Sequence, residues 1–300
     1  MKKNQHPHPD HDRGLEFDLR TLLSRRASLG VLAGLGTMAA VSACAPASDS
    51  SVTAGSSGAA NTSGTSASSA SSSAASSATA SATASESSLA AFCSTATPQE
   101  TAGPYPGDGS NGPDVLLESG VVRSDIRSSF GSSTTTAQGV PLTVTLTLLS
   151  ASGCTPLPGA ALYLWHANRD GQYSMYDSAI SNENYLRGVQ QADGNGKLSF
   201  TTIFPAAYSG RWPHIHFEVY ESLNNATESG KIMATSQLAL PKDVCDTVYA
   251  TTGYEQSVKN LAEITLGSDN VFGDDGGIHQ LATVAGSVTA GYTAQLNVVI

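Results

Sequence analysis

The chain has 300 residues, of which 15 are Lys or Arg and 25 are Asp or Glu, so its formal net charge is −10 at pH 7. This acidic balance comes without a basic stripe or interleaved aromatic and basic residues, which argues against nucleic acid as a partner. A chain of this length can hold one large domain or two small ones.

The N-terminal region has the pattern of an export signal. Arg25 and Arg26 precede an apolar run of small residues, 27–43, which ends at Cys44. The run is too short and too rich in Gly, Ala and Ser for a membrane span, so it is read as a secretory signal peptide over 1–43. The paired arginines favour the twin-arginine export route.

The end of this signal resembles the cleavage site of a bacterial lipoprotein, with the sequence Val41-Ser42-Ala43-Cys44. This reading implies cleavage before Cys44 and a lipid on its sulfur, which would be the only contact with a membrane. An ordinary signal peptide with an incidental cysteine is the alternative. The expected location is the periplasm or the cell surface, with the protein anchored to a bacterial membrane.

The segment after the signal changes composition abruptly. Residues 44–88 are almost entirely Ser, Ala, Thr and Gly after the cysteine, and such a segment buries too little apolar surface to offset the entropy of ordering. We therefore expect a disordered tether. Residues 89–300 remain, which is ample length for one domain with its own core.

The domain reads as a series of short strands separated by turns rich in Gly, Pro, Asn and Asp. In the segment 141–150, leucines and a valine alternate with threonines, as in a half-buried strand. The other expected strands are 159–167, 196–204, 214–220, 233–240 and 292–300, and a short helix or two is expected within 241–263. This pattern predicts an all-β protein, an antiparallel β-sandwich with short helices and long loops.

Three cysteines remain after the signal, namely Cys93, Cys154 and Cys245. In an exported protein two of them are expected to pair and one to stay reduced. Their spacing does not select the pair, and none has the Cys-x-x-Cys spacing of a metal site.

The strand 214–220 carries a candidate metal site. Residues two apart in a strand point to the same face, so His214 and His216 project together while Ile215 faces the other way. Tyr208 precedes this strand in a loop, and Tyr173 follows a turn after an earlier strand. Each residue alone has an ordinary structural explanation: a hydrogen-bonded histidine pair, or tyrosines at the rim of a core.

Two imidazoles and two phenols together form a partly anionic ligand set without a thiolate. Phenolate is a strong donor to ferric iron, as in haem proteins with a tyrosine ligand. The set differs from the two-histidine, one-carboxylate arrangement of ferrous oxygenases. The donor types therefore favour non-haem Fe(III).

Several segments resemble the intradiol ring-cleavage dioxygenases, the family of protocatechuate 3,4-dioxygenase and catechol 1,2-dioxygenase. They are TPQETAGPYP (97–106), VVRSDIR (121–127), LYLWHANRDGQYS (162–174), YLRGVQQADGNGKLSFTTIFP (185–205) and YSGRWPHIHF (208–217). They occur in the family's order, and the resemblance runs from about residue 93 to the C-terminus.

The resemblance implies a role for individual residues. It makes Tyr173, Tyr208, His214 and His216 the ligands of a ferric ion. It gives Tyr208 a second role as the base that leaves the metal, and it assigns Arg211 and Gln237 to charge stabilisation on the substrate. Gly103, Pro104 and Tyr105 match a segment at the mouth of the substrate pocket. The implied reaction cleaves a catechol-type ring with O₂ to a cis,cis-muconate-type diacid.

The resemblance also bears on the cysteines, because exported relatives fill the positions of Cys93 and Cys154 with cysteine. These two are expected to form the disulfide, which leaves Cys245 as the spare thiol.

Two other functions remain open from the sequence. A non-catalytic, transthyretin-like β-sandwich that binds ligands at the cell surface would explain the strands and the anchor but not the ligand-type residues. A copper site that uses the His-x-His pair is the second alternative. Among substrates, catechol, protocatechuate, hydroxyquinol and lignin-derived catechols all stay possible.

Overall fold

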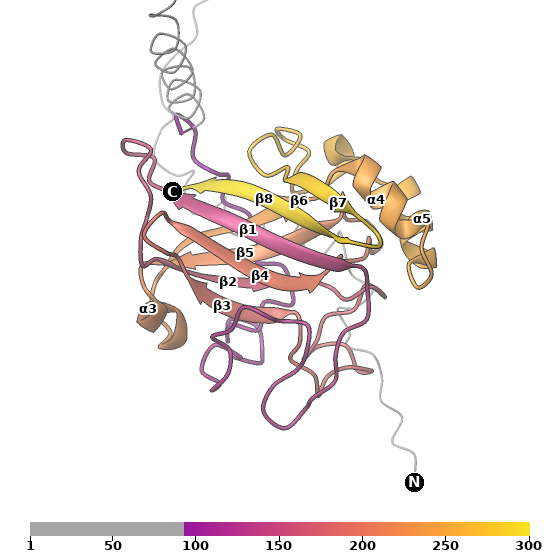
Figure 1. Ribbon diagram of the computed structural model, residues 1–300, viewed down its shortest axis with the longest axis horizontal. Helices are drawn as coiled ribbons and strands as arrows, with labels where there is room; N and C mark the ends of the chain where they lie inside the picture. Colours follow the sequence, from indigo (N-terminus) through magenta and orange to yellow (C-terminus); the bar gives the residue numbers. More distant parts are fainter. Residues whose placement is uncertain (1–92) are drawn as a thin grey trace, which may run out of the picture.

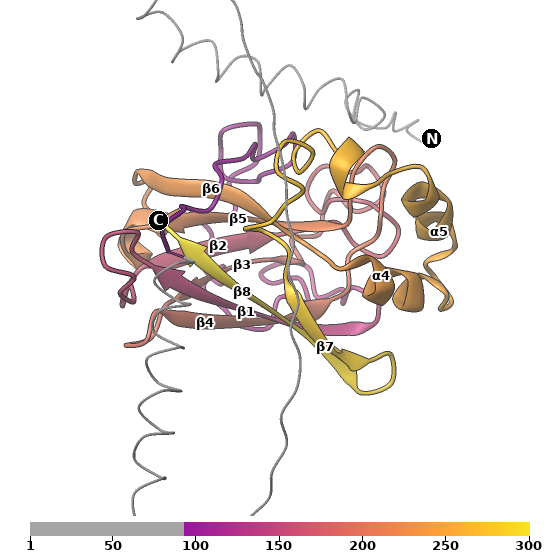
Figure 2. The ribbon, with the colours of Figure 1, turned by 90° about the horizontal axis from the view of Figure 1, so that it is seen from above.

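The computed structural model describes residues 93–300. The predicted signal peptide, the tether and Cys44 lie outside the described residues. The described chain forms two four-stranded sheets that pack face to face, with the helices at the two ends of the strands (Figures 1 and 2).

The first sheet has the strand order β4-β1-β8-β7 and the second has the order β3-β2-β5-β6. The strands of the first sheet are β1 (Pro141–Leu149), β4 (Lys197–Ile203), β7 (Thr283–Ser287) and β8 (Gly291–Val299). Those of the second are β2 (Ala161–Trp165), β3 (Arg187–Gln191), β5 (His214–Tyr220) and β6 (Ile232–Ala239). The predicted β-sandwich is therefore confirmed, and β3 and β7 are strands that the sequence pattern did not indicate.

The expectation of purely antiparallel sheets is wrong in one sheet. β1 and β8 pair in parallel, with Leu142 opposite Tyr292 and Leu149 opposite Val299. Every other strand pair is antiparallel. A parallel pair needs a long connection rather than a hairpin, and here nearly the whole domain lies between the two strands.

The core lies between the two sheets and follows the alternation of the strands. From the first sheet, Val144 and Leu146 are fully buried, and from the second, Ile215 and Phe217 are fully buried in the same cluster. Because Ile215 and Phe217 face this core, the histidines of β5 must face the other side of their sheet. The sequence prediction for the two faces of this strand is confirmed.

The helices are short. They are α3 (Leu223–Thr227), α4 (Lys242–Tyr249), α5 (Glu255–Ala262) and the 3₁₀ helix η1 (Leu266–Ser268). The predicted helices within 241–263 are α4 and α5, which lie together at one end of the sandwich, whereas α3 was not expected (Figure 1). Across residues 93–300, none of the helices combines the length and the apolar character needed to cross a bilayer.

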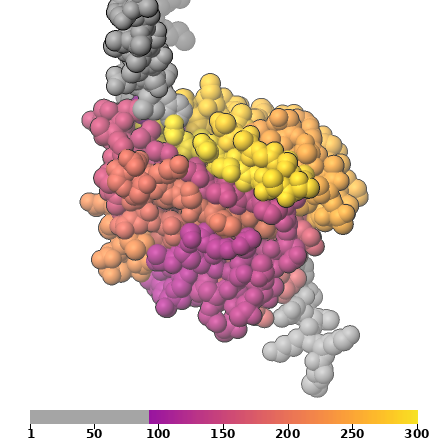
Figure 3. All heavy atoms as spheres, in the orientation of Figure 1, coloured from indigo at the N-terminus to yellow at the C-terminus, as the bar shows by residue number. Residues whose placement is uncertain are grey.

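A long segment before β1 covers the outer face of the second sheet. Val115, Leu116 and Val121 are buried there against Tyr163 and Trp165 of β2. In the space-filling view this segment, in purple, makes up much of the face below the yellow C-terminal strands (Figure 3). The outer face of the second sheet is thus covered as well.

Arg187 of β3 holds this segment in place. Its guanidinium is buried and donates hydrogen bonds to the carbonyl oxygens of Tyr105 (2.9 Å), Pro106 (2.7 Å) and Ser174 (2.9 Å). One side chain thereby ties the segment before β1 to the loop after β2. Both of these loops reach the candidate site described below.

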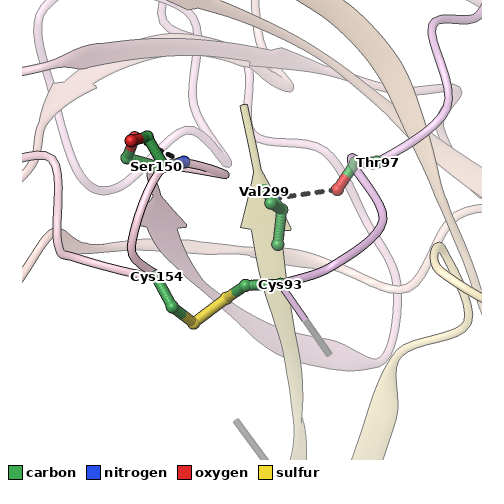
Figure 4. The surroundings of a disulfide bond; sticks show 6 residues. Cys93, Thr97, Ser150, Cys154 and Val299 are labelled. Atoms are coloured by element: carbon green, nitrogen blue, oxygen red, sulfur yellow. Dashed lines mark hydrogen bonds between the residues drawn. A yellow bond between two sulfur atoms is a disulfide. The ribbon is translucent and has the colours of Figure 1, made fainter. Parts of the chain in front are cut away.

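A disulfide joins Cys93 to Cys154, next to the end of β8 (Figure 4). The chain just after Cys93 is also bonded to β8, because Thr97 N–H donates to Val299 O and Val299 N–H donates to Thr97 Oγ1, both at 2.9 Å. Cys245 is reduced and buried. The expected pairing and the expected spare thiol are both confirmed.

Candidate metal centre

The four predicted ligands come together on the outer face of the second sheet, under the segment that precedes β1. His214 and His216 project from β5, with ring centroids 4.7 Å apart. The ring of Tyr208 lies 5.5 Å from that of His214, and the ring of Tyr173 lies 6.1 Å from that of His216. The two tyrosine rings are 5.9 Å apart.

The imidazole nitrogens that face each other are the two Nε2 atoms. The His214 Nε2 atom lies 3.0 Å from His216 Nε2 and 3.2 Å from the phenol oxygen of Tyr208. With metal–imidazole bonds of about 2.1 Å, two nitrogens 3.0 Å apart subtend roughly a right angle at one ion. The spacing is that of two neighbouring ligands on the same metal.

Both imidazoles are neutral, so each ring has one nitrogen whose lone pair can bind a metal. Burial is the main cause that lowers the pKa of His214 and His216 well below the usual value, and the charge of Arg211 lowers both further. The Nδ1–H of His214 donates to the carbonyl oxygen of Trp212, which fixes the tautomer with a bare Nε2. His216 Nδ1 is buried without a hydrogen-bond partner among the described residues.

A tight turn over residues 168–172 positions Tyr173 at the site. The side-chain oxygen of Asn168 accepts hydrogen bonds from the N–H groups of Asp170 and Gln172, both at 2.9 Å. Gly171 in this turn has φ +83°, and a Cβ at this position would lie 3.2 Å from the Cβ of Tyr208. A residue without a side chain therefore lets the Tyr173 turn approach Tyr208 closely.

The loop before Tyr208 is tied to the helices. Ala207 N–H donates to Ser257 Oγ at 3.2 Å, and Asn260 Nδ2 donates to the Ala207 oxygen at 2.8 Å. Tyr249 donates through its hydroxyl to the Pro205 oxygen at 3.0 Å. α4 and α5 therefore anchor this loop, and the phenol of Tyr208 reaches the site.

Arg211 and Gln237 also lie at the site, as predicted. The Nη2 group of Arg211 donates to Gln237 Oε1 at 2.6 Å. Gln237 is the partner of His216 in the pairing of β5 with β6, and its amide nitrogen donates to the Thr101 oxygen at 2.9 Å. The charge of the guanidinium also lowers the pKa of both imidazoles.

Of the predicted pocket-mouth residues, Tyr105 reaches the site directly. Its ring lies 5.0 Å from that of Tyr173. Gly103 has φ +70° and Pro104 is buried, and together they turn the chain so that Tyr105 lies over Tyr173. The structure thus brings Tyr105 to the candidate ligands, whereas Gly103 and Pro104 belong to the chain that leads to it.

Three further residues at the site were not predicted from the sequence. Asp269 accepts a hydrogen bond from Arg211 Nε at 3.0 Å, and the indole of Trp165 stacks on His216. Glu100 is 8% exposed, and burial first, then the charge of Asp274, raises its pKa to about 8. Only Trp165 could have been found from the sequence, since it occupies an alternating position in an apolar strand beside the motif.

The donor set fits a ferric ion. Within residues 93–300 no three side chains of His, Cys, Asp and Glu gather as a metal set, so a metal here would depend on the phenols. Two neutral imidazoles and two phenols would provide two anionic oxygens and two nitrogens, which suits a hard trivalent ion better than a copper or zinc site.

Comparisons with known proteins agree with this geometry. A family model described as Dioxygenase matches residues 119–227, the part of the chain that holds all four candidate ligands and Arg211. Catechol 1,2-dioxygenase 1 of Acinetobacter lwoffii is 35% identical over 69 residues, which are 23% of this chain and 22% of that protein. Chlorocatechol 1,2-dioxygenase of Rhodococcus opacus is 35% identical over 54 residues, 18% of this chain and 21% of that protein.

The matches thus span about a fifth of the length of these two relatives. Among solved structures, an intradiol ring-cleavage dioxygenase from Tetranychus urticae has the same fold, with a TM-score of 0.54 and 24% identity over 69% of this chain and 94% of that one. Residues 119–227 are thus similar in sequence to dioxygenases, and the described domain has the fold of an intradiol ring-cleavage dioxygenase.

Proposed function

We propose that this protein is an enzyme that cleaves catechol-type rings with O₂, between the two hydroxyl-bearing carbons, to cis,cis-muconate-type diacids. Non-haem Fe(III) is the proposed cofactor, held by Tyr173, Tyr208, His214 and His216. The observation that carries this proposal is the convergence of the two Nε2 atoms, 3.0 Å apart, beside the Tyr208 phenol.

When bound, a ferric ion would supply Lewis acidity, which lowers the pKa of a bound hydroxyl and draws electron density from the ring. The protein's own groups have three tasks. They hold the metal, they accept protons from the substrate, and they stabilise charge that develops on its oxygens.

Tyr208 is the proposed proton acceptor. A catechol carries two hydroxyl protons, and the phenolate oxygen of Tyr208 would take one of them. Tyr208 is partly exposed whereas Tyr173 is 4% exposed, so Tyr208 is the tyrosine with room to move away. The proton would end on the Tyr208 oxygen as a neutral phenol.

Arg211 and Gln237 are the proposed charge-stabilising pair. Their side chains are 1% and 0% exposed, so a donor here acts in a medium with little water, where hydrogen bonds to charge are strong. By analogy with single donors in other enzymes, each would lower the barrier by about 3 kcal/mol. The segment over the outer face of the sheet keeps bulk water from the reacting groups.

The non-catalytic binding module and the copper site are less well supported. A transthyretin-like module requires the sandwich but no convergence of four donors. A copper site would not require two phenols. Neither alternative explains why the two tyrosines come from separate loops and meet the same pair of imidazoles.

One experiment tests the proposal. The purified protein should contain one iron per chain, show a visible phenolate-to-iron absorption band that makes it burgundy, and consume O₂ in proportion to added catechol. The product mass should equal that of catechol plus two oxygen atoms. A colourless or blue protein that takes up no O₂ with catechol, protocatechuate or hydroxyquinol would refute the assignment.

We also propose that the protein is exported and anchored through a lipid on Cys44, with 44–88 as its tether. The signal-type sequence motivates this proposal, and the Cys93–Cys154 disulfide supports it, because disulfides persist in oxidising compartments outside the cytosol. Metabolic labelling with a radioactive fatty acid should mark the parent protein. The Cys44→Ala variant should stay unlabelled and leave the membrane fraction, and labelling of that variant would contradict the anchor.

A further inference from the structure

Asp269 is a buried carboxylate that receives four hydrogen bonds. Its Oδ2 accepts from Arg211 Nε at 3.0 Å and from the N–H of Trp212 at 2.7 Å. Its Oδ1 accepts from the N–H groups of Val271 at 2.8 Å and Phe272 at 3.1 Å. The side chains of Asp269 and Arg211 are 0% and 1% exposed, so this ion pair has been removed from water completely.

An ion pair this deeply buried is weak evidence for stability, because desolvation offsets much of the attraction between the charges. Its geometry, however, restricts two neighbouring groups at once. The Nε bond and the Gln237 bond, the latter 2.6 Å from Nη2, together fix the plane of the Arg211 guanidinium. A guanidinium held at two of its nitrogens cannot rotate about its own axis.

The second restricted group is the main chain at Trp212. Its N–H is bound to Asp269, and its carbonyl oxygen accepts the Nδ1–H of His214. The same peptide segment therefore connects the Asp269 carboxylate to the ring orientation of His214. The indole of Trp212 is anchored separately, through a 2.9 Å bond from Nε1 to the Leu240 oxygen.

We propose that Asp269 is a positioning residue of the site, which orients Arg211 toward the substrate oxygens and holds the Trp212 peptide that sets the ring of His214. This inference rests on the proposed dioxygenase function. Asp269 itself touches neither the substrate nor the candidate metal ligands. Because small misplacements of a catalytic group are costly, loss of this orientation should reduce turnover by about 10–100-fold.

The sharpest variant is Asp269→Asn. The amide oxygen can still accept from the N–H groups of Val271 and Phe272, whereas the amide nitrogen cannot accept from Arg211 Nε or from the Trp212 N–H. The matched control is Asp246→Asn, which removes the carboxylate of an exposed ion pair with Lys242 on α4. Both changes remove one negative charge, but only the first lies beside the site.

A double-mutant cycle then separates positioning from general loss of structure. For catechol, kcat/KM is measured in the parent, Asp269→Asn, Arg211→Gln and the double variant, together with iron content. We expect Asp269→Asn to lose at least tenfold with iron retained, but to cost several-fold less when Arg211 is already Gln, because only the route through Trp212 and His214 then remains. An equal loss in both backgrounds would overturn the action through Arg211.

The metal-free protein gives a readout that does not depend on turnover. The Nδ1–H proton of His214, held by the Trp212 oxygen, should give a slowly exchanging NMR resonance, assigned by its loss in His214→Gln. In Asp269→Asn this proton should exchange at least tenfold faster, and in Asp246→Asn at the parent rate. Parent-like exchange in Asp269→Asn would overturn the second route, through Trp212.

Arg211→Lys keeps the test valid even if Asp269→Asn does not fold. Lysine preserves the charge but lacks the Nε–H group that Asp269 binds. It should lose at least tenfold in kcat/KM, and parent-like turnover would overturn the proposal. A parent protein that cleaves no catechol would refute the proposed function instead. The exchange rate of the His214 Nδ1–H proton would still decide whether Asp269 holds the ring of His214.

Discussion

The indole of Trp165 lies flat against the imidazole of His216, with ring centroids 4.9 Å apart and an angle of 9° between the planes. The two residues are cross-strand partners in the pairing of β2 with β5, so the sheet itself sets this contact. An aromatic wall on one side leaves the ring of His216 little freedom to rotate. Its Nε2 therefore stays directed at His214 although its Nδ1 has no hydrogen-bond partner among residues 93–300.

Replacing this histidine should remove the metal. In His216→Ala one of the two imidazole donors held in place by β5 is lost, whereas Tyr208, the ligand proposed to leave during the reaction, remains. We expect iron per chain, measured by atomic emission after purification, to fall at least tenfold, and the visible absorption band to disappear with it.

The control for this change is His279→Ala. His279 is half-buried in the loop before β7, beside the exposed Ile278 and Leu281, and is none of the proposed ligands. This variant should keep one iron per chain. Full iron occupancy and unchanged colour in His216→Ala would show that His216 is not a ligand.

The disulfide should contribute substantially to stability. It closes a loop with a sequence separation of 61 residues, for which the chain-entropy model gives about 4 kcal/mol. For a domain of this size, the double variant Cys93→Ser/Cys154→Ser should therefore unfold about 10 °C below the parent, measured by circular dichroism.

Reduction and alkylation provide the control. A reductant should lower the unfolding temperature of the parent but not of the double variant. The third cysteine, Cys245, is buried and burial raises the pKa of its thiol, so it should resist iodoacetamide until the protein unfolds. A parent protein that is insensitive to reductant would contradict the stabilising role of the bond.

Glu100 should make the stability of the metal-free protein depend on pH. Burial, and secondarily Asp274, raises the pKa of this carboxyl from 4.5 in the unfolded chain to about 8 in the folded protein. Between these values the folded state holds a proton that the unfolded state has released. The contribution of Glu100 to the free energy of unfolding should therefore decrease as the pH rises from about 4.5 to 8, and the full cost of burying the charge applies above that range.

Thermal unfolding from pH 5 to pH 9 measures this effect. The variant Glu100→Gln should be less sensitive to pH in this window and more stable than the parent at its upper end. Glu263→Gln, at the exposed C-terminal end of α5, removes the same charge and should keep the pH profile of the parent. A stability difference between the parent and Glu100→Gln that does not change with pH would mean that Glu100 is not protonated in the folded state.

The sequence was sufficient for the parts of the fold that depend on local pattern. Alternation in β1 and β5 predicted which side chains face the core, and it placed His214 and His216 on one face. It missed β3 because its sequence, RGVQQ, includes a glycine and three polar side chains. It missed β7 because that edge strand is mostly exposed and therefore lacks a buried face.

Properties that depend on distant parts of the chain could not be predicted in this way. The parallel pairing of β1 with β8 joins the two ends of the domain, and a strand pattern does not indicate its neighbour in the sheet. Asp269 follows Arg211 by 58 positions and lies in a loop without a recognisable motif. Its role becomes visible only when the loop folds against the chain before β5.

Tyr208 and Tyr173 should differ in what they contribute to the proposed site. The main chain before Tyr208 is bonded to Ser257 and Asn260 of α5, so we expect its phenol to rotate away from the metal while the loop stays in place. Tyr173 is buried and lies under Tyr105, where it has no comparable room. Tyr208 is therefore the better candidate for a ligand that leaves and accepts a proton.

Two phenylalanine variants separate these roles. Tyr208→Phe should retain most of its iron through the other three ligands but lose at least 100-fold in catechol turnover, because the proton acceptor is gone. Its visible absorption band should weaken and shift rather than vanish, since Tyr173 still donates to iron. Tyr173→Phe should instead lose iron and colour together. The deciding measurements are iron content and O₂ uptake on the same preparations. Parent-like turnover by Tyr208→Phe would exclude the proton-accepting role of Tyr208. That outcome would leave the four-ligand site itself intact.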